Sequence, residues 1–353
     1  MSARTTDFVR RATGARQAER EQVIQTLWSG YGEIVRYRLQ GADRPTVILK
    51  HVVFPDAMDH PRGWSNDRSH RRKVRSYQVE MAWYRDWAGL CNPVSRVPHC
   101  LAAETIGEEH LLLLEDLDAA GFARRKEHLT RAEAPHCLHW LARFHARFLG
   151  HAPKGLWPEG SYWHLSTRPD EWAAIEDPAM RAAAPALDAA LTGARHRTLV
   201  HGDAKVANFC FTPGADAVAA VDFQYAGGGC GMRDVAYFLG SCLDEREQEA
   251  WEAELLEVYF AALGKALYAE GKGDVTGAVE REWRALFPVA QADFYRFLVG
   301  WMPDHWKIHD YSRRMALAVI HRIQEEGGSG TDPESIPGPI SGSSPSSSAT
   351  SSQ

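Results

Sequence analysis

The sequence has no long apolar run and few cysteines. Its longest runs, such as Leu111–Leu114, fall far short of the roughly 18 residues that a membrane-spanning helix needs, so we expect no membrane span. The six cysteines form no Cys-x-x-Cys pair and are too sparse for a disulfide framework. We therefore expect reduced thiols in a cytoplasmic protein.

An excess of basic residues is also missing. Lysine and arginine total 40 against 46 aspartates and glutamates, which gives a formal net charge of −6. Nucleic-acid-binding proteins usually show the opposite balance, so we expect no nucleic-acid partner. Apolar residues (44%) and charged residues (24%) have the proportions of an ordinary globular protein. This excludes fibrous and wholly disordered chains, and nothing in the pattern implies an obligate protein partner.

The composition changes sharply near the C-terminus. Residues 327–353 consist mainly of serine, glycine and proline. Such a segment cannot bury enough apolar area to offset the entropy lost on ordering it, so we predict a disordered tail over 327–353. At roughly 100 to 200 residues per domain, the rest of the chain favours two domains or one two-lobed fold.

The hydrophobic patterns indicate the order of the secondary structure elements. We predict in chain order a β-hairpin, a helix, a buried strand, a helix, two short strands and further helices, at 32–53, 76–87, 110–117, 130–149, 198–200 with 218–223, and 232–325. This order predicts an α+β fold with a small N-terminal antiparallel-sheet lobe and a larger helical C-terminal lobe. We place the N-terminal lobe at 1–117 and the helical lobe at 118–326.

Three polar residues with an informative spacing lie in the middle of the chain. Asp203 precedes Asn208 by five residues and Asp222 by nineteen. Phosphoryl transfer from a nucleotide needs magnesium ligands and a carboxylate that accepts the proton of the attacking hydroxyl. A loop with Asp203 and Asn208, together with Asp222 at a strand end, can bring the base and both metal ligands to one point.

Two upstream features fit a nucleotide site. Kinase-like enzymes need a strand lysine, held by a helix glutamate, to grip the α and β phosphates. Lys50 ends an apolar strand segment, and Glu80 follows thirty residues later in the predicted helix. Gly30 and Gly32 predict a turn whose backbone N–H groups can approach a triphosphate.

These residues resemble a known group of enzymes. His-Gly-Asp-x-x-x-x-Asn at 201–208, followed by Asp-Phe-Gln at 222–224, is similar to the aminoglycoside phosphotransferase and choline kinase-like superfamily. It is most like the ecdysteroid-kinase-like family within it. Leu-Leu-Glu-Asp-Leu at 113–117 resembles the hinge of that family, and residues 141–146 resemble the helix that follows.

The resemblance implies a protein-kinase-like fold, the cofactors ATP and Mg²⁺, and phosphorylation of a hydroxyl on a small molecule. It implies that Asp203 is the catalytic base and that Asn208 and Asp222 bind magnesium. Lys50, paired with Glu80, would contact the phosphates.

The resemblance also implies two further roles. The hinge residues Glu115, Asp116 and Leu117 would receive adenine through their backbone. Asp234 would brace the catalytic loop from a helix as structural support, without taking part in the chemistry.

Lys205 marks one departure from that family. The family commonly has an aromatic residue two positions after the base, whereas this chain has a lysine, as protein kinases do. We predict that Lys205 neutralises charge on the transferred phosphoryl group; the alternative is a surface lysine.

Two other functions stay open at this point. A protein kinase would need His-Arg-Asp and Asp-Phe-Gly, but Gly202 and Gln224 replace the diagnostic residues, and no Ala-Pro-Glu follows. A non-catalytic nucleotide-binding homologue is the other alternative, although such proteins usually lose the base or a metal ligand.

The acceptor is the least defined feature. Tryptophans and tyrosines are dense in the predicted helical lobe, which suits a steroid or terpenoid alcohol, a quaternary amino alcohol or a sugar. We predict a pocket wall at Trp301, Asp304 and His305, because Pro303 breaks a helix there. Aminoglycosides fit less well, because the acidic residues are dispersed.

One basic run precedes the first predicted helix. Residues 71–75 read Arg-Arg-Lys-Val-Arg. We interpret the run as a solvated linker that enters the helix, with recruitment of an anionic substrate or nucleic acid as the alternative.

Overall fold

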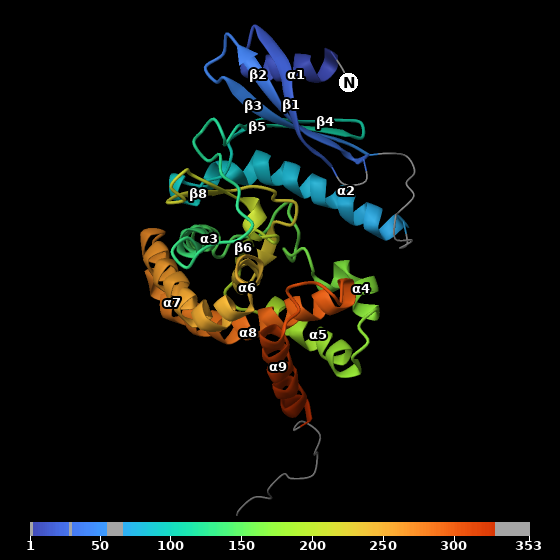
Figure 1. Ribbon diagram of the computed structural model, residues 1–353, viewed down its shortest axis with the longest axis vertical. Coiled ribbons are helices and arrows are strands. Elements are labelled where there is room, and N and C mark those ends of the chain that lie inside the picture. Colours follow the sequence, from blue (N-terminus) through green and yellow to red (C-terminus); the bar gives the residue numbers. More distant parts are fainter. Residues whose placement is uncertain (1–2, 28–29, 55–65, 329–353) are drawn as a thin grey trace, which may run out of the picture.

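An antiparallel sheet forms the N-terminal part of the protein. The computed structural model describes residues 3–27, 30–54 and 66–328. The sheet has five strands in the order β1-β2-β3-β5-β4, with helix α1 on one face and helix α2 on the other (Figure 1). The bounds are α1 (Ala3–Thr13), β1 (Gln17–Thr26), β2 (Gly32–Gln40), β3 (Thr46–Val53), α2 (Asn66–Ala82), β4 (Cys100–Ile106) and β5 (Glu109–Glu115).

A larger helical part follows the sheet. Two short antiparallel ladders, β6 with β9 and β7 with β8, lie on its side nearest to α2 (Figure 1). The bounds are α3 (Ala134–Phe148), α4 (Pro169–Ala173), α5 (Pro178–Thr192), β6 (Thr198–Val200), β7 (Phe209–Phe211), β8 (Val218–Ala220), β9 (Gly227–Gly229), α6 (Met232–Cys242), α7 (Glu245–Ala269), α8 (Thr276–Trp301) and α9 (Asp310–Gly328). The predicted α+β kinase-like fold is therefore confirmed.

Alternation along β3 places different side chains on the two faces of the sheet. Val47 and Leu49 lie on the face covered by α1, where they cluster with Phe8 of that helix. Ile48 and Lys50 are offset by one residue, so they lie on the opposite face and line a cavity. The strand period thus determines on which side of the sheet the Lys50 ammonium lies.

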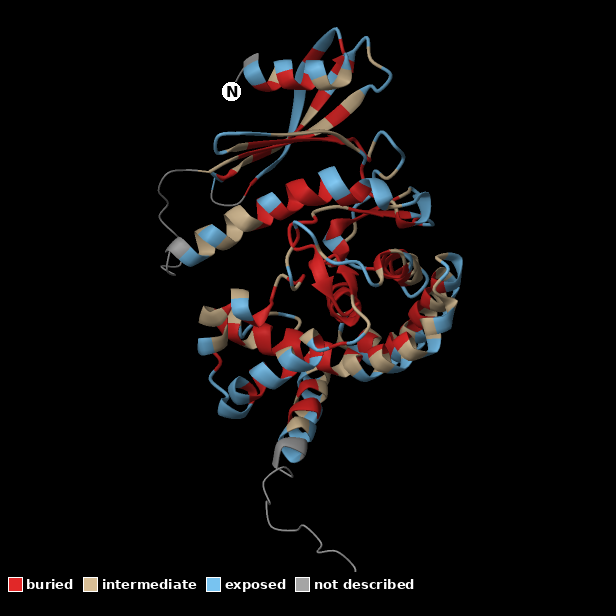
Figure 2. Cartoon of the chain, turned by 180° about the vertical axis from the view of Figure 1, so that it is seen from behind, coloured by how far each residue is buried: buried red, intermediate tan, exposed pale blue. Residues whose placement is uncertain are grey.

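Aromatic rings join α2 to the helical part. The helix continues as a π-helical turn, Trp83–Trp87. The Trp83 ring stacks on Phe223 with a centroid distance of 4.3 Å and also contacts Phe144 of α3. Figure 2 shows this central region as buried, whereas the outer faces of the peripheral helices are exposed. Burial of these rings fixes α2 against the segment that carries Asp222.

Several predicted boundaries shift in the structure. The helix predicted over 76–87 begins ten residues earlier, at Asn66, so the basic run lies within α2 and the predicted linker is wrong. The helix predicted over 130–149 begins at Ala134, because Pro135 belongs to its first turn. Just before this helix, the Glu133 carboxylate accepts from the Thr130 N–H at 3.1 Å.

Seven of the helices and strands were not predicted: α1, β1 and β4 in the sheet part, and α4, α5, β7 and β9 in the helical part. Strand β1 is almost wholly exposed and polar, so it has no apolar alternation to recognise. Helix α1 is rich in arginine and buries chiefly Phe8 and Val9. Strand β4 is at the opposite edge of the sheet and is only half-buried. The tail predicted over 327–353 lies outside the described residues, apart from the last two residues of α9.

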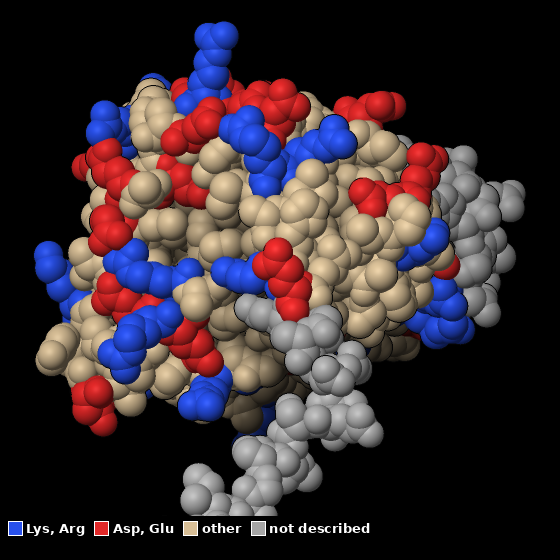
Figure 3. All heavy atoms as spheres, turned by 90° about the horizontal axis from the view of Figure 1, so that it is seen from below, with Lys and Arg blue, Asp and Glu red and all other residues tan. Residues whose placement is uncertain are grey.

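The face at the helical end carries both signs of charge. Figure 3 shows lysines and arginines interspersed with aspartates and glutamates, without a large area of one sign. Such a surface lacks the basic stripe typical of nucleic-acid binding. Within the described parts of the chain, no helix combines the length and the apolar character needed to cross a membrane.

Gly300 provides a test of the helix packing. A Cβ on Gly300 of α8 would overlap the carbonyl oxygen of Glu171 at α4, so we expect Gly300→Ala to lower the free energy of unfolding by about 1–3 kcal/mol. Gly264 in α7 has room for a Cβ, and Gly264→Ala should leave stability unchanged or raise it by up to about 1 kcal/mol. Denaturant unfolding of both variants is the measurement; equal stabilities would contradict this packing.

Candidate active site

A cavity of about 900 Å³ lies between the sheet and the helical part. Strands β1 to β3, the end of β5 and helix α2 form one side, and the segments around Asp203 and Asp222 form the other. Ten of the predicted site residues line it: Lys50, Glu80, Glu115, Asp116, Leu117, Asp203, Lys205, Asn208, Asp222 and Trp301. The fold therefore brings together side chains as far apart in the sequence as Lys50 and Trp301.

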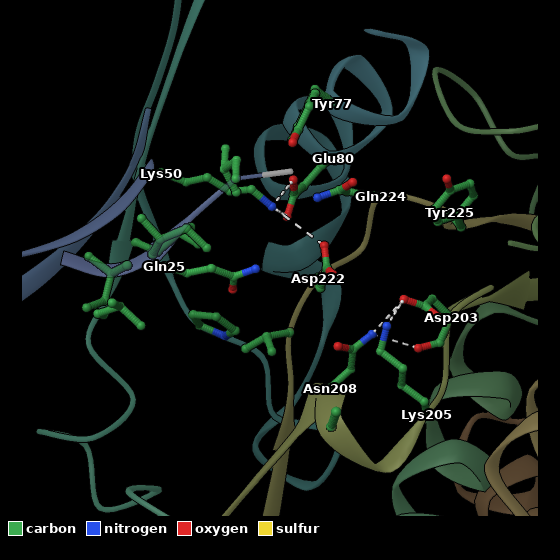
Figure 4. Close-up of a pocket in the computed structure, with 18 of the residues that line it drawn as sticks. Gln25, Lys50, Tyr77, Glu80, Asp203, Lys205, Asn208, Asp222, Gln224 and Tyr225 are labelled. Carbon is green, nitrogen blue, oxygen red and sulfur yellow. Dashed lines mark hydrogen bonds and ion pairs between the residues drawn. The ribbon is translucent and has the colours of Figure 1, made fainter. Parts of the chain in front are cut away.

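Lys50 and Glu80 form a buried ion pair that joins β3 to α2. The Lys50 Nζ lies 2.7 Å from Glu80 Oε2 and 2.9 Å from Oε1 (Figure 4). Burial opposes protonation of Lys50, but the carboxylates of Glu80 and Asp222 outweigh it and raise its pKa. The ammonium is therefore charged at neutral pH and points into the cavity.

Asp222 lies just beyond this pair, in an unusual backbone conformation. Its φ is +67°, a left-handed value that non-glycine residues seldom adopt and that costs of order 1–3 kcal/mol. Its Oδ1 lies 3.6 Å from the Lys50 Nζ and has no hydrogen-bond partner within the described residues. Desolvation opposes ionisation, but the ammonium groups of Lys50, Lys205 and Lys73 outweigh it and lower the pKa of Asp222. Asp222 is an ionised carboxylate with a free oxygen.

Asp203 faces Asp222 from the opposite loop. Its Oδ2 accepts hydrogen bonds from the Lys205 Nζ and the Asn208 Nδ2, both at 3.0 Å (Figure 4). Its Oδ1 is buried and has no partner among the described residues. The Asp203 carboxylate, opposed by partial burial, raises the pKa of Lys205. One oxygen of Asp203 is thus held in place, and the other is free to accept a proton from a ligand.

The loop that carries Asp203 is clamped by two buried side chains. The Asp234 carboxylate accepts from the backbone N–H of His201 at 2.6 Å and of Gly202 at 2.9 Å, and contacts His145 Nε2 at 3.1 Å. His201 Nδ1 accepts from the Asp203 N–H, so the ring proton is on Nε2, which donates to the Val221 carbonyl at 2.9 Å. The bracing role implied for Asp234 is present in this geometry.

The hinge follows β5 directly. The Asp116 carboxylate accepts from Arg36 and Thr46, both at 2.7 Å, and these bonds, working against burial, lower its pKa. Glu115 accepts from Arg96 at 2.5 Å. These side chains are therefore occupied by the protein. The Glu115 N–H and the carbonyl oxygens of Asp116 and Leu117 are also bonded within the chain, to His99, Ala120 and Phe122.

The two glycines lie beside the cavity without lining it. Gly32 has a φ of +125°, and a Cβ there would overlap the carbonyl oxygen of His51 on the paired strand, so the close approach of β2 and β3 requires glycine. Gly30 has a φ of +75° with open space around it. Trp28 and Ser29, the rest of the predicted turn, lie outside the described residues.

The three residues predicted to form a wall of the acceptor pocket do not all line the cavity. Trp301 lines the cavity, whereas Asp304 is exposed. His305 is not among the lining residues and packs against Trp301 in a tilted arrangement, with ring centroids 5.7 Å apart. Tyr162, one of the dense aromatic residues expected around the acceptor, also lines the cavity. Sequence reasoning missed other lining residues: Arg72, Lys73, Tyr77, Arg168 and Tyr225. The basic run is the sequence signal for the first two, and its interpretation as a linker hid their place in the cavity.

The cavity residues fit a hard divalent cation. Asp222 Oδ1 accepts no hydrogen bond within the described residues, and Asn208 donates through its amide nitrogen, which leaves its carbonyl oxygen free. Magnesium prefers such oxygen ligands and usually completes its shell with phosphate oxygens and water. In keeping with that, the described residues contain no cluster of three or more His, Cys, Asp or Glu side chains that would hold a metal alone.

The sequence matches a family model over most of its length. Residues 23–273 match the phosphotransferase enzyme family, APH, so the chain belongs to this family. It is therefore a phosphotransferase of the aminoglycoside phosphotransferase and choline kinase-like group. No curated protein matches the sequence.

Solved structures show the same overall resemblance at low identity. A Ralstonia eutropha protein provisionally described as an aminoglycoside phosphotransferase is 14% identical, with 91% of this chain and 95% of that chain covered and a TM-score of 0.48. The microcompartment-associated aminopropanol kinase is 15% identical, with coverages of 88% and 94% and a TM-score of 0.46. A Haemophilus somnus protein provisionally described as a fructosamine-3-kinase is 12% identical, with coverages of 90% and 96% and a TM-score of 0.46.

The clamp on the Asp203 loop can be tested through stability. Asp234→Asn replaces an oxygen that accepts backbone N–H groups with a donor, so we expect a loss of about 1–3 kcal/mol for each donor left unpaired. Denaturant unfolding measures it, with the exposed Asp310→Asn as the control. Unchanged stability of Asp234→Asn would show that the loop is held by other contacts.

Proposed function

We propose that this protein transfers the γ-phosphoryl group of ATP to a hydroxyl of a small molecule. The observation that carries the proposal is the unpartnered, buried Oδ1 of Asp203, which faces the same cavity as the Lys50–Glu80 pair and Asp222. Family membership supports phosphoryl transfer. A base, a phosphate-binding cation and metal-binding oxygens around one cavity are the parts that such a reaction requires.

In the proposed step, the acceptor oxygen attacks the γ-phosphorus while the bond from phosphorus to the bridging oxygen breaks. The acceptor proton passes to Asp203 Oδ1, and the products are a phosphate ester and ADP. Lys205, at 3.0 Å from the other oxygen of Asp203, orients the base and neutralises charge on the moving phosphoryl group. Magnesium, held by Asn208 and Asp222, would neutralise the phosphate oxygens.

The nucleotide would occupy the sheet side of the cavity. Lys50 would contact the α and β phosphates, and Gly30 and Gly32 would let the backbone of their turn approach the triphosphate. The hinge backbone at 115–117 would receive adenine. The apolar side chains that would enclose the adenine ring are Ile34, Ile48, Leu114 and Val221.

Further properties are proposed on the same basis. We place the N-terminal nucleotide-binding lobe at 1–117 and the catalytic and acceptor-binding lobe at 118–326. The Asp-Phe-Gln motif and the hinge sequence support a place near the ecdysteroid-kinase-like family, and an acceptor among steroid or terpenoid alcohols, amino alcohols and sugars. Free thiols at all six cysteines support a cytoplasmic location.

Variants of the proposed base and of a proposed metal ligand distinguish a catalytic protein from one that only binds nucleotide. Asp203→Asn should lower acceptor-dependent ADP release by about 10²- to 10⁴-fold and leave Mg–ATP binding intact, because the base acts on the acceptor. The measurement is a coupled ADP assay against a pool of alcohols, amino alcohols, sterols and sugars, with calorimetry for ATP. Asp310→Asn is the control; a pool-stimulated rate that survives Asp203→Asn would rule out the proposed base.

Asp222→Asn should act on binding instead. Loss of an ionised ligand should weaken Mg–ATP affinity by about 10- to 100-fold, while affinity for metal-free ATP changes little. Calorimetric titrations with and without Mg²⁺ measure both. If the two variants behave alike, Asp203 and Asp222 do not have separate roles.

The departure at Lys205 has its own test. Lys205→Ala should lower kcat by about 10²- to 10³-fold, the usual effect of removing one group that stabilises transition-state charge, with little change in the KM for ATP. Lys205→Arg should recover part of the rate, and Lys265→Ala on the exposed side of α7 is the control. An unchanged kcat in Lys205→Ala would leave Lys205 with no catalytic role.

A further inference from the structure

Several cations line the cavity. Arg36 and Arg125 bind Asp116 and Asp118 next to the hinge, and Lys50 binds Glu80. Four further cations line the cavity: Arg72, Lys73, Arg168 and Lys205. Two of them have carboxylate partners: Arg168 is 3.0 Å from Glu171, and Lys205 is 3.0 Å from Asp203. The other two, Arg72 and Lys73, have no such partner among the described residues.

Within the described residues, the side-chain hydrogen bonds of Arg72 and Lys73 go to neutral groups. Arg72 donates to the Thr167 carbonyl at 3.0 Å and to Ser69 Oγ at 3.4 Å. Lys73 donates to Gln224 Oε1 at 2.9 Å and lies 4.7 Å from the centre of the Tyr77 ring. Within the described chain, no carboxylate forms an ion pair with either of them.

Burial without a paired carboxylate disfavours the charged forms of Arg72 and Lys73, and their pKa values reflect this. Burial, followed by repulsion from Arg168, lowers the pKa of Arg72. Burial lowers the pKa of Lys73 to about 8, although the nearby carboxylates favour its charged form. A partly buried cation without a counter-ion destabilises a protein, so a ligand that brings negative charge would relieve the cost.

An aromatic wall stands next to these cations. Tyr162 packs against Tyr225 and Trp301, with ring centroids 5.2 and 6.4 Å away, and Arg168 lies 4.3 Å over its ring. The Tyr162 N–H donates to the Gly202 carbonyl at 2.7 Å, one residue before Asp203. The wall is therefore fixed beside the proposed base.

We propose, on the basis of the proposed function, that the acceptor carries an anionic group that Arg72 and Lys73 bind. The group is a carboxylate or a phosphate, and the apolar body of the acceptor lies against the aromatic wall of Tyr162, Tyr225 and Trp301. Oxyanions form strong charge-assisted hydrogen bonds with arginine and lysine. An acceptor with several amino groups would meet repulsion at the same place.

The geometry assigns this anion to the acceptor instead of ATP. Arg72 is surrounded by Thr167 and Arg168 on the helical side, whereas the nucleotide side has its own cation in Lys50. Lys73, bonded to Gln224, lies between the two regions. Arg72 is therefore the more selective anchor.

Acceptors that differ only in charge provide the test. We would measure ADP release from Mg–ATP with 4-(hydroxymethyl)benzoate, the matching benzamide and the matching benzylamine. A second arm compares the monophosphate of 1,4-benzenedimethanol with the parent diol. We expect kcat/KM for an anion to exceed that of its neutral partner by about 10- to 100-fold, and the arm that responds identifies the carboxylate or the phosphate.

Charge-removing variants locate the effect. Arg72→Gln and Lys73→Gln should raise the KM for the anionic acceptor by about 10- to 100-fold, with the KM for ATP unchanged. Arg72→Lys keeps the charge and should keep the preference. Arg71→Gln, at the adjacent exposed position outside the cavity, is the matched control and should change neither constant.

Three results would overturn the inference. The first is a preference of the wild type for the neutral or cationic compound, which would leave the proposed function intact if turnover requires Asp203. The second is a rise in the KM for ATP alone in both variants. The third concerns the case in which neither anionic acceptor is phosphorylated. Calorimetry on the Mg–ADP complex would then measure binding of 4-(hydroxymethyl)benzoate and of the monophosphate to the wild type and to Arg72→Gln. Absence of binding that depends on Arg72 would reject the proposal. ADP release independent of Asp203 would instead reject the proposed function.

Discussion

The buried ammonium of Lys50 is the interaction on which the candidate site depends. It lies within 2.7 Å of Glu80 on α2 and 3.6 Å of Asp222 on the facing loop, so one charge ties together the sheet, a helix and the helical part. A buried cation is costly unless it is paired and hydrogen-bonded. The sheet therefore cannot shift relative to α2 without leaving a charge unpaired. This constraint fixes the spacing between the sheet, α2 and the Asp222 loop, which form walls of the cavity.

A second constraint holds the opposite wall. Asp234 takes up two backbone N–H groups of the 201–202 turn, and the neutral ring of His201 links that turn to Val221, one residue before Asp222. The left-handed backbone of Asp222 is strained, and such strain persists only where the surroundings fix it. The stacking of Trp83 on Phe223 adds to that fixation from the α2 side. Rigid loops on both sides let Asp203 and Asp222 face each other before any ligand binds.

The sequence predicted the parts of the site that are local and missed those that are not. Asp203, Asn208 and Asp222 lie within twenty residues, and their spacing reflects one loop and one short ladder. Lys50 was predictable because an alternating strand carries it. Arg72 and Lys73 were misassigned because the start of α2 has no apolar period, and the residues that enclose them, such as Tyr162 and Trp301, are distant in sequence. Strand β1 was missed because an exposed edge strand needs no apolar face.

The cationic side chains that line the cavity differ in their partners. Lys50 and Lys205 are each fixed by a carboxylate, which sets their positions and keeps them charged; a catalytic group needs both properties. Arg72 and Lys73 donate to neutral groups and form no ion pair with a carboxylate among the described residues. Preorganised pairs lower the barrier for any phosphoryl transfer, whereas unpaired cations discriminate between acceptors because only an anionic ligand relieves their cost. Chemistry and selectivity would thus reside in separate residues, which allows the acceptor to change during evolution while the phosphoryl-transfer groups stay fixed.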